Sequence, residues 1–344
     1  MTVRVAVVGL GMMGTTHFKA YQEIGEARVV AVCDVEGRKL SGDWSGVASN
    51  IDTGAARHAD LSSLRTYSSY DDLLKDDGVD LVDVCLPTFL HAEMALRSFK
   101  AGKHVVCEKP MGRTSREARR MAVAAGRAGR FLGVGHVLRF WPEYVAMKEM
   151  IDSGRYGAVR SAHFSRFSPR PERSWNNWLQ DPSRSGSAVL DLHIHDTDAV
   201  QWFFGRPAKV TSRGTFDAAG GVSHILSAFD CEGGAMIVAE AGWDFPPSFP
   251  FRMTARVIFE EAAAEFDSTR TPTLIVHNAK TGEVEAPAFP QVNAYAEELR
   301  YFVRCIAEGR PPERITPADA AAAIAIVEAE IKSARSGRAV KVEV

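Results

Sequence analysis

Apolar and polar positions in the first 135 residues alternate between strand-like and helix-like patterns. Short apolar runs predict strands at Val3–Val8, Val29–Cys33, Leu81–Leu86, His104–Cys107 and Phe131–Gly135. Helical spacing predicts helices at Thr15–Ile24, His91–Lys100 and Ser115–Ala128. The stretch Gly37–Ser69 has no clear period and is interpreted as a long loop with at most one weak helix. Strands that alternate with helices over short connections predict a parallel sheet covered on both faces.

The pattern changes in the second half of the chain. Longer alternating segments predict a largely antiparallel sheet, with strands at Val159–Phe167, Ala208–Phe216, Ser223–Phe229, Ala235–Ala241 and Met253–Glu260. Helices are predicted at Ser187–Phe204, Ala294–Glu308 and Pro317–Ser336, the last with Thr316 as its N-cap and Gly337 at its end. The fold class is therefore α/β with two domains. Residues 1–130 form a doubly wound parallel sheet and residues 131–344 a second α/β domain, whose C-terminal helix is able to pack back on the first.

Composition fits two ordinary globular domains in a chain of 344 residues, with 46% hydrophobic and 24% charged residues. The 41 basic and 43 acidic residues nearly cancel, so the net charge does not indicate binding to nucleic acid or to an anionic membrane. No apolar run approaches the roughly 20 residues of a membrane span. Arg4 inside the first apolar run argues against a secretory signal. Five scattered cysteines without a C-x-x-C pair suggest reduced thiols, and we expect a cytoplasmic protein.

The turn after the first strand is the clearest chemical signal. It reads G-x-G-x-x-G, and its members are Gly9, Leu10, Gly11, Met12, Met13 and Gly14. A strand precedes it, a helix follows, and Asp34 ends the second strand, which is the context of a dinucleotide-binding Rossmann fold. Phosphates would lie at the helix N-terminus, and Asp34 would accept from the adenosine ribose hydroxyls. We expect NAD rather than NADP, although the nearby Arg38 and Lys39 could favour the extra phosphate of NADP.

Further motifs follow the later strands. They are the P-T-x-x-H of Pro87, Thr88 and His91, the E-K-P of Glu108, Lys109 and Pro110, and a D-x-x-x-H formed by Asp191 and His195. Together with the glycine turn and Asp34, the chain resembles the Gfo/Idh/MocA family, the group of glucose-fructose oxidoreductase and inositol dehydrogenase. The resemblance covers essentially the whole length.

The resemblance implies a Rossmann domain followed by an α/β domain with an open sheet. That sheet commonly serves as an oligomer interface, so a homodimer or homotetramer is implied. The cofactor site would include Pro87, Thr88, His91, Glu108 and Lys109 beside the glycine turn, and a cis peptide often precedes the proline of E-K-P. Lys109 and His195 would flank the reacting carbon, with Asp191 beside them.

The residues agree with this chemistry. Asp191 and His195 lie four positions apart on a predicted helix and would share a face, and Asp198 could orient His195. Oxidation of an alcohol needs a base for the hydroxyl proton, and a histidine that titrates near neutrality is suitable. A lysine ammonium would stabilise the developing alkoxide. Taken separately, these motifs are also compatible with an ordinary turn and a solvated helix pair.

The pair His193 and His195 raises the alternative of a metal site. Residues two apart on a helix point in different directions, and no cysteine is close in sequence, so no metal is expected. The family commonly has glycine at the position of His193, which suggests that this histidine helps to select the substrate.

The remaining substrate contacts are expected from a cluster of aromatic and polar residues. Indoles stack on the C–H faces of sugars, while Asn and Arg side chains bind hydroxyls. The alternative is a surface loop with a packing tryptophan. The cluster comprises Arg166, Trp175, Asn176, Asn177, Trp178 and Arg184.

The leading hypothesis is an NAD-dependent oxidoreductase that converts a secondary alcohol of a sugar, inositol or related polyol to a ketone, or the reverse. Hydride would pass to C4 of the nicotinamide, with His195 as the base. A second hypothesis is an enzyme that retains NAD during glycoside cleavage or elimination, so that NADH does not accumulate. A third is a non-catalytic NAD-binding regulator, against which Lys109 and His195 argue.

Overall fold

The computed structural model describes residues 2–47, 57–171 and 174–343. It divides into two compact units that are both discontinuous in sequence. Unit 1 comprises Met1–Val137 and Val292–Ala321, and unit 2 comprises Leu138–Gln291 and Ala322–Val344. The two units are defined only by the contacts within each of them. The domain boundary expected between residues 130 and 131 therefore stays a prediction.

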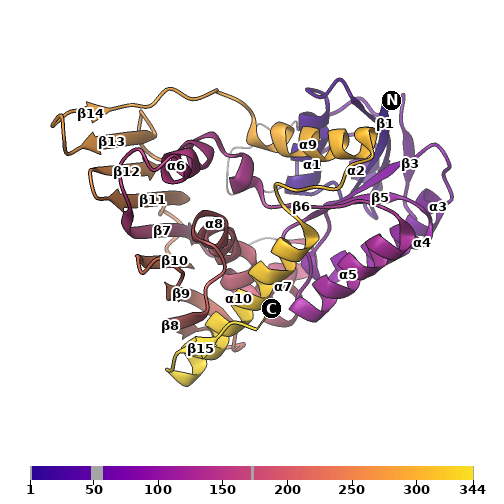
Figure 1. Ribbon diagram of the computed structural model, residues 1–344. Helices are drawn as coiled ribbons and strands as arrows, with labels where there is room; N and C mark the ends of the chain where they lie inside the picture. Colours follow the sequence, from indigo (N-terminus) through magenta and orange to yellow (C-terminus); the bar gives the residue numbers. More distant parts are fainter. Residues whose placement is uncertain (1, 48–56, 172–173, 344) are drawn as a thin grey trace. The chain divides into compact units, whose positions relative to one another are not determined.

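Unit 1 is built on six parallel strands in the order β3-β2-β1-β4-β5-β6 (Figure 1). The strands are β1 (Val3–Val8), β2 (Ala27–Cys33), β3 (Arg65–Tyr67), β4 (Leu81–Val84), β5 (His104–Glu108) and β6 (Leu132–Gly135). The helices are α1 (Met12–Tyr21), α2 (Gly37–Leu40), α3 (Tyr70–Leu74), α4 (Thr88–Lys100), α5 (Ser115–Ala128) and α9 (Ala294–Glu308). This strand order brings the carboxyl ends of β1, β4 and β5 side by side, where ligands bind in doubly wound sheets.

Helix α9 belongs to unit 1 although it follows most strands of the second sheet in the chain. It packs along α1, and Arg304 forms an ion pair of 2.9 Å with Glu26. The ring of Phe302 lies so close to Gly133 of β6 that a Cβ there would come within 2.7 Å of it. Glycine at this position therefore permits the helix to approach the sheet.

Unit 2 is built on a nine-stranded sheet in the order β14-β13-β12-β11-β7-β10-β9-β8-β15. Only β7 and β10 pair in parallel, and the other pairs are antiparallel. The strands are β7 (Val159–Pro169), β8 (Lys209–Phe216), β9 (Val222–Asp230), β10 (Met236–Phe245), β11 (Arg252–Phe259), β12 (Ala262–Asp267), β13 (Leu274–Asn278), β14 (Val284–Glu285) and β15 (Val340–Lys341). The predicted α/β fold with a parallel first sheet and a largely antiparallel second sheet is confirmed.

Helices cover one face of this second sheet. One apolar core joins the helices to the sheet. It includes Met147, Phe203 and Ile326 from three different helices, and Phe164 and Phe266 from the sheet. Figure 1 shows these helices on the same side of the strands. The helices of this part are η1 (Val137–Phe140), α6 (Pro142–Asp152), η2 (Trp175–Gln180), α7 (Pro182–Ser185), η3 (Val189–His193), α8 (Ile194–Phe204) and α10 (Pro317–Ser336).

Several helices and strands of the structure were missed or merged in the prediction from sequence. The expected 37–69 loop contains α2 and the whole edge strand β3, while its residues 48–56 lie outside the described residues. Helix α6 and strands β12 to β15 were not predicted. The predicted helix Ser187–Phe204 is in fact two elements, a π-helical turn at Val189–His193 followed by α8.

The last helix has the ends expected from the sequence. Thr316 Oγ1 accepts from the Asp319 N–H at 3.1 Å, and the Asp319 carboxylate accepts from the Thr316 N–H at 3.0 Å. This reciprocal pair is a capping box. Among the described helices, none has the length and apolar content needed to cross a membrane.

Candidate functional site

The glycine turn has the geometry that a dinucleotide requires. Gly9 adopts a φ of 88°, a conformation that favours glycine, and a Cβ on Gly14 would collide with the Gly9 carbonyl oxygen. A Cβ on Gly11 would meet nothing within 4 Å, so the backbone is open at that point. Helix α1 begins at Met12 without a side-chain cap. Its first N–H groups are therefore suited to phosphate oxygens, and NAD fits this turn.

Asp34 is joined to the glycine turn by a direct hydrogen bond. Its Oδ2 accepts from the Leu10 N–H at 2.7 Å, and its Oδ1 accepts from the Glu36 N–H at 2.8 Å. Lys39 lies 2.7 Å from Glu36 and 3.7 Å from Asp34, while Arg38 pairs with Asp43 at 3.2 Å. The two cations that the sequence placed near this site are thus engaged with carboxylates.

The turns after β4 and β5 are linked by His91. Its Nδ1 lies 2.8 Å from the carbonyl oxygen of Pro110, and its Nε2 lies 2.7 Å from that of Leu86. The ring is buried, and this burial lowers the pKa of His91. Thr88 is buried in the first turn of α4, and Pro87 precedes that helix as its N-cap residue. The Lys109–Pro110 peptide bond is cis.

Glu108 is buried at the end of β5 and contacts a histidine that the sequence analysis did not select. His17 Nε2 lies 3.1 Å from Glu108 Oε1, and His17 Nδ1 lies 2.9 Å from Asp83 Oδ2. The other oxygen of Glu108 accepts from the Lys109 N–H at 3.1 Å. Burial alone would raise the pKa of Glu108, but His17 and Lys109 lower it. Two polar residues inside otherwise buried segments, His17 in α1 and Asp83 in β4, were the signal available in the sequence.

The same cluster contains the types of side chain that bind metals. One ligand atom from each of His17, Asp83 and Cys85 lies within 4.8 Å of the others. Cys85 Sγ is 3.4 Å from His17 Nδ1, and burial together with the Asp83 carboxylate raises the pKa of the Cys85 thiol. A neutral thiol is a poor metal ligand. Hydrogen bonds among these residues account for the arrangement, and we assign no metal to it.

The segment with Asp191, His193 and His195 lies at the start of α8 in unit 2. Because Asp191 belongs to a π-helical turn, the four-residue spacing of an α-helix does not describe its relation to His195. Asp191 and His195 are half-buried, whereas His193 is buried with its Nε2 2.8 Å from Glu330 Oε1. Burial opposes the charged ring, but Glu330 raises the pKa of His193. His193 therefore anchors the turn to α10, and its expected role toward the substrate remains a prediction.

Two buried ion pairs hold the same segment. Arg166 donates to Asp196 at 3.0 and 3.1 Å, and Arg139 donates to Asp198 at 2.9 and 2.8 Å. Both are bidentate, the strongest geometry for such a pair. The guanidinium of Arg166, expected in the substrate pocket, is thus bound to Asp196 inside unit 2. The carboxylate of Asp198, expected to orient His195, accepts from Arg139 and from Gln201.

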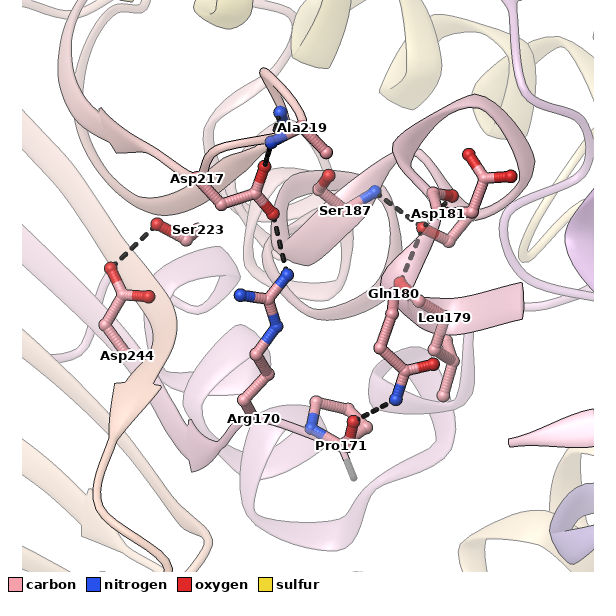
Figure 2. A network of polar contacts seen from close by, with 12 residues as sticks. Arg170, Pro171, Leu179, Gln180, Asp181, Ser187, Asp217, Ala219, Ser223 and Asp244 are labelled. Atoms are coloured by element: carbon pink, nitrogen blue, oxygen red, sulfur yellow. Dashed lines mark hydrogen bonds and ion pairs between the residues drawn. The ribbon is translucent and has the colours of Figure 1, made fainter. Parts of the chain in front are cut away.

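The tryptophan segment is held by a separate polar network. Figure 2 shows Arg170 directed at Asp217 in the β8–β9 turn, with an N–O distance of 2.8 Å, and Gln180 bonded to the carbonyl of Pro171. Arg184 donates to the Asn176 carbonyl at 2.9 Å. Asn176 and Asn177 have positive φ, which asparagine tolerates. Trp175 is 41% exposed and Trp178 is half-buried, so indole surface is available to a ligand.

The parallel sheet with its glycine turn defines a dinucleotide-binding protein. Comparisons with known proteins give the family. Residues 3–136 match an oxidoreductase family with an NAD-binding Rossmann fold, and residues 144–265 match the GFO/IDH/MocA C-terminal domain. The chain belongs to the Gfo/Idh/MocA family of oxidoreductases, as the resemblance in sequence implied.

Individual relatives act on sugars and polyols, judged by their names. The chain is 30% identical to 1,5-anhydro-D-fructose reductase of Ensifer adhaerens, over 87% of this chain and 90% of the relative. It is 25% identical to myo-inositol 2-dehydrogenase of Thermotoga maritima, over 99% of both chains. The structure of levoglucosan dehydrogenase in complex with NADH and levoglucosan superimposes with a TM-score of 0.85 and 20% identity, covering 100% of both chains. At that identity the last comparison supports the fold alone.

Proposed function

We propose that the chain is an NAD-dependent dehydrogenase that oxidises a secondary alcohol of a sugar, inositol or related polyol to a ketone, or catalyses the reverse. The observation that carries the proposal is the position of Lys109 directly after β5, in the same sheet edge as the glycine turn after β1. Bound NAD would supply a hydride acceptor at C4 of its nicotinamide. Lys109 stabilises the substrate oxygen, His195 takes the hydroxyl proton, and Asp191 orients the pair.

The contacts of Asp34 support NAD as the preferred cofactor. Both carboxylate oxygens are fixed by backbone N–H groups, so the charge is held beside the glycine turn. A 2′-phosphate at the adenosine ribose would meet this carboxylate, and Lys39 and Arg38 are already paired with acids. A relative from Haloferax volcanii is named D-xylose 1-dehydrogenase (NADP(+)) 2, at 28% identity over 87% of this chain and 92% of the relative, so cofactor preference differs among relatives and is worth measuring.

An activity screen of sugars and inositols with NAD and NADP in parallel tests the proposal. We expect NADH to accumulate with at least one polyol, and kcat/KM to be about tenfold or more higher with NAD than with NADP, which corresponds to roughly 1.4 kcal/mol. Turnover of a glycoside without accumulation of NADH would favour the NAD-retaining alternative. Binding of NAD without turnover of any polyol would favour a regulator.

The uncovered face of the second sheet supports an oligomer. Its centre carries small and apolar side chains together with the charged Arg256, Glu265 and Glu240, and Leu226 and Met236 are exposed on the same face at 42% and 67%. A sheet face of this kind can be covered by a second sheet. The small and apolar members are Ser161, Val238, Thr254, Ile258 and Ala263. We infer a homodimer or homotetramer through this face, and light scattering that gives the mass of one chain would exclude it.

The cysteines support a cytoplasmic location. All five are free, and Cys107 is buried with a raised pKa, which argues against a reactive thiol. We place the protein in the reducing cytoplasm on this ground.

A further inference from the structure

Lys109 lies between two residues that are each held by a buried histidine. On one side, Glu108 contacts the ring of His17, which comes from α1. On the other side, the carbonyl of Pro110 contacts the ring of His91, which comes from α4. Both histidines belong to unit 1, and both are at most 1% exposed.

The His17 side is a chain of close polar contacts, in which the contact with Asp83 is a hydrogen bond and the contact with Glu108 is an ion pair. Asp83 faces Nδ1 of His17, and Glu108 Oε1 faces Nε2 at 3.1 Å. The second oxygen of Glu108 accepts from the backbone N–H of Lys109. Burial disfavours the charged ring, but the Asp83 carboxylate raises the pKa of His17. A protonated ring attracts both carboxylates, and its ion-pair contact restrains the side chain of Glu108.

The His91 side links two turns of the sheet edge. The ring lies between the carbonyls of Pro110 and Leu86, at 2.8 and 2.7 Å. A carbonyl only accepts, so the bond to Pro110 requires a proton on Nδ1 and a bond to Leu86 requires one on Nε2. A neutral ring donates to only one of them, and the proposal assigns the proton to Nδ1. This bond fixes the backbone on the C-terminal side of Lys109 relative to the turn after β4.

We propose that His17 and His91 are positioning residues for Lys109, acting through Glu108 and Pro110 on either side of it. The proposal rests on the role given to Lys109 in the proposed function. Two anchors on adjacent residues leave the backbone of Lys109 little freedom. This restricts the positions that the ammonium at the end of its side chain can reach. A displacement of about 1 Å in such a group can cost about 100-fold in rate.

Asparagine and glutamine variants separate this role from simple packing. Asn places its amide nitrogen near the position of Nδ1, and Gln places it near that of Nε2. For His17, Gln keeps the donor to Glu108 and Asn loses it. For His91, Asn keeps the donor to Pro110 and Gln loses it. The proposal therefore expects His17→Asn and His91→Gln to lower kcat about 10- to 100-fold, and the conservative His17→Gln and His91→Asn to recover most of that loss.

The measurements are kcat and KM with the polyol found in the screen, NAD affinity by calorimetry, and Tm. NAD affinity is expected to stay within about threefold in the two His17 variants, because His17 is not among the residues expected at the cofactor. His104→Gln is the matched control, because His104 lies at the opposite end of β5 and its Nδ1 accepts from the Phe131 N–H at 3.1 Å. Equal kcat in both variants of each histidine, or the reverse order, would overturn the inference.

The inference and the proposed function fail in different ways. Full activity in Lys109→Ala would contradict the role of Lys109 in the proposed function, independently of the results for the histidine variants. Loss of activity in Lys109→Ala without the expected order among the histidine variants removes the inference alone. If a histidine variant does not fold, the proposal is tested by nitrogen NMR of the natural protein, which shows which ring nitrogens of His17 and His91 carry a proton. A proton on Nε2 of His17 and on Nδ1 of His91 supports the proposal, and a bare nitrogen at either position overturns it.

Discussion

Lys109→Ala is expected to lower kcat by about 100- to 1,000-fold while NAD still binds. The ammonium stabilises charge that develops on the substrate oxygen, so its loss raises the barrier without removing the contacts of the glycine turn and Asp34. Those contacts come from β1, β2 and α1, and replacement of Lys109 leaves them in place. Steady-state kinetics with the polyol from the screen, together with calorimetry for NAD, gives both quantities.

His195→Ala tests the base in the same assay. A general base contributes typically 10²- to 10⁴-fold, so a loss of that size is expected, again with NAD binding retained. Lys100→Ala is a suitable control, because Lys100 is exposed at the end of α4. Full activity in either Lys109→Ala or His195→Ala would remove that residue from the mechanism.

Asp196→Ala is expected to cause the largest loss of stability, about 3–5 kcal/mol in the free energy of unfolding. Arg166 is 3% exposed, and its guanidinium donates to both oxygens of Asp196. Removal of the carboxylate leaves a buried cation without its anion, which costs far more than the ion pair itself stabilises. Chemical denaturation of the variant and the natural protein measures the difference.

A paired variant and a surface control sharpen this result. Arg166→Met together with Asp196→Ala removes both charges, and we expect it to be more stable than Asp196→Ala alone. Asp230→Ala breaks a pair with Lys209 whose side chains are 60% and 51% exposed, and a change within about 1 kcal/mol is expected. A loss of similar size for Asp196→Ala and Asp230→Ala would contradict the importance given to the buried pair.

The sequence was most informative where local signals agree. Helix Ser115–Ala128 was predicted with its observed ends, because its period is clear, the Thr114 side chain accepts from the Glu117 N–H, and Gly129 ends it with a positive φ. Strand β3 was missed because it has three residues at the edge of the sheet and no buried apolar run. The π-helical turn was missed because apolar periodicity does not distinguish it from an α-helix.

The candidate site was predictable only in part, for a different reason. The residues with motif spacing could be selected because the motif itself marks them. The partners that fix them come from distant parts of the chain, such as His17 for Glu108 and Glu330 for His193. No local pattern encodes such a pair, since His17 and Glu330 each lie among other polar residues of their helices and only the fold selects them as partners.

The placement of α9 has a consequence for the order in which the protein is made. The six-stranded sheet leaves the ribosome first, yet the helix that packs along α1 and brings Phe302 against Gly133 is synthesised only after strands β7 to β14 of the second sheet. Until then the groove for α9 exposes apolar surface in the nascent chain. Completion of the nucleotide-binding half thus waits for residues 292–321 to be translated, so a chain interrupted before them lacks a finished first unit even though all six of its strands are present.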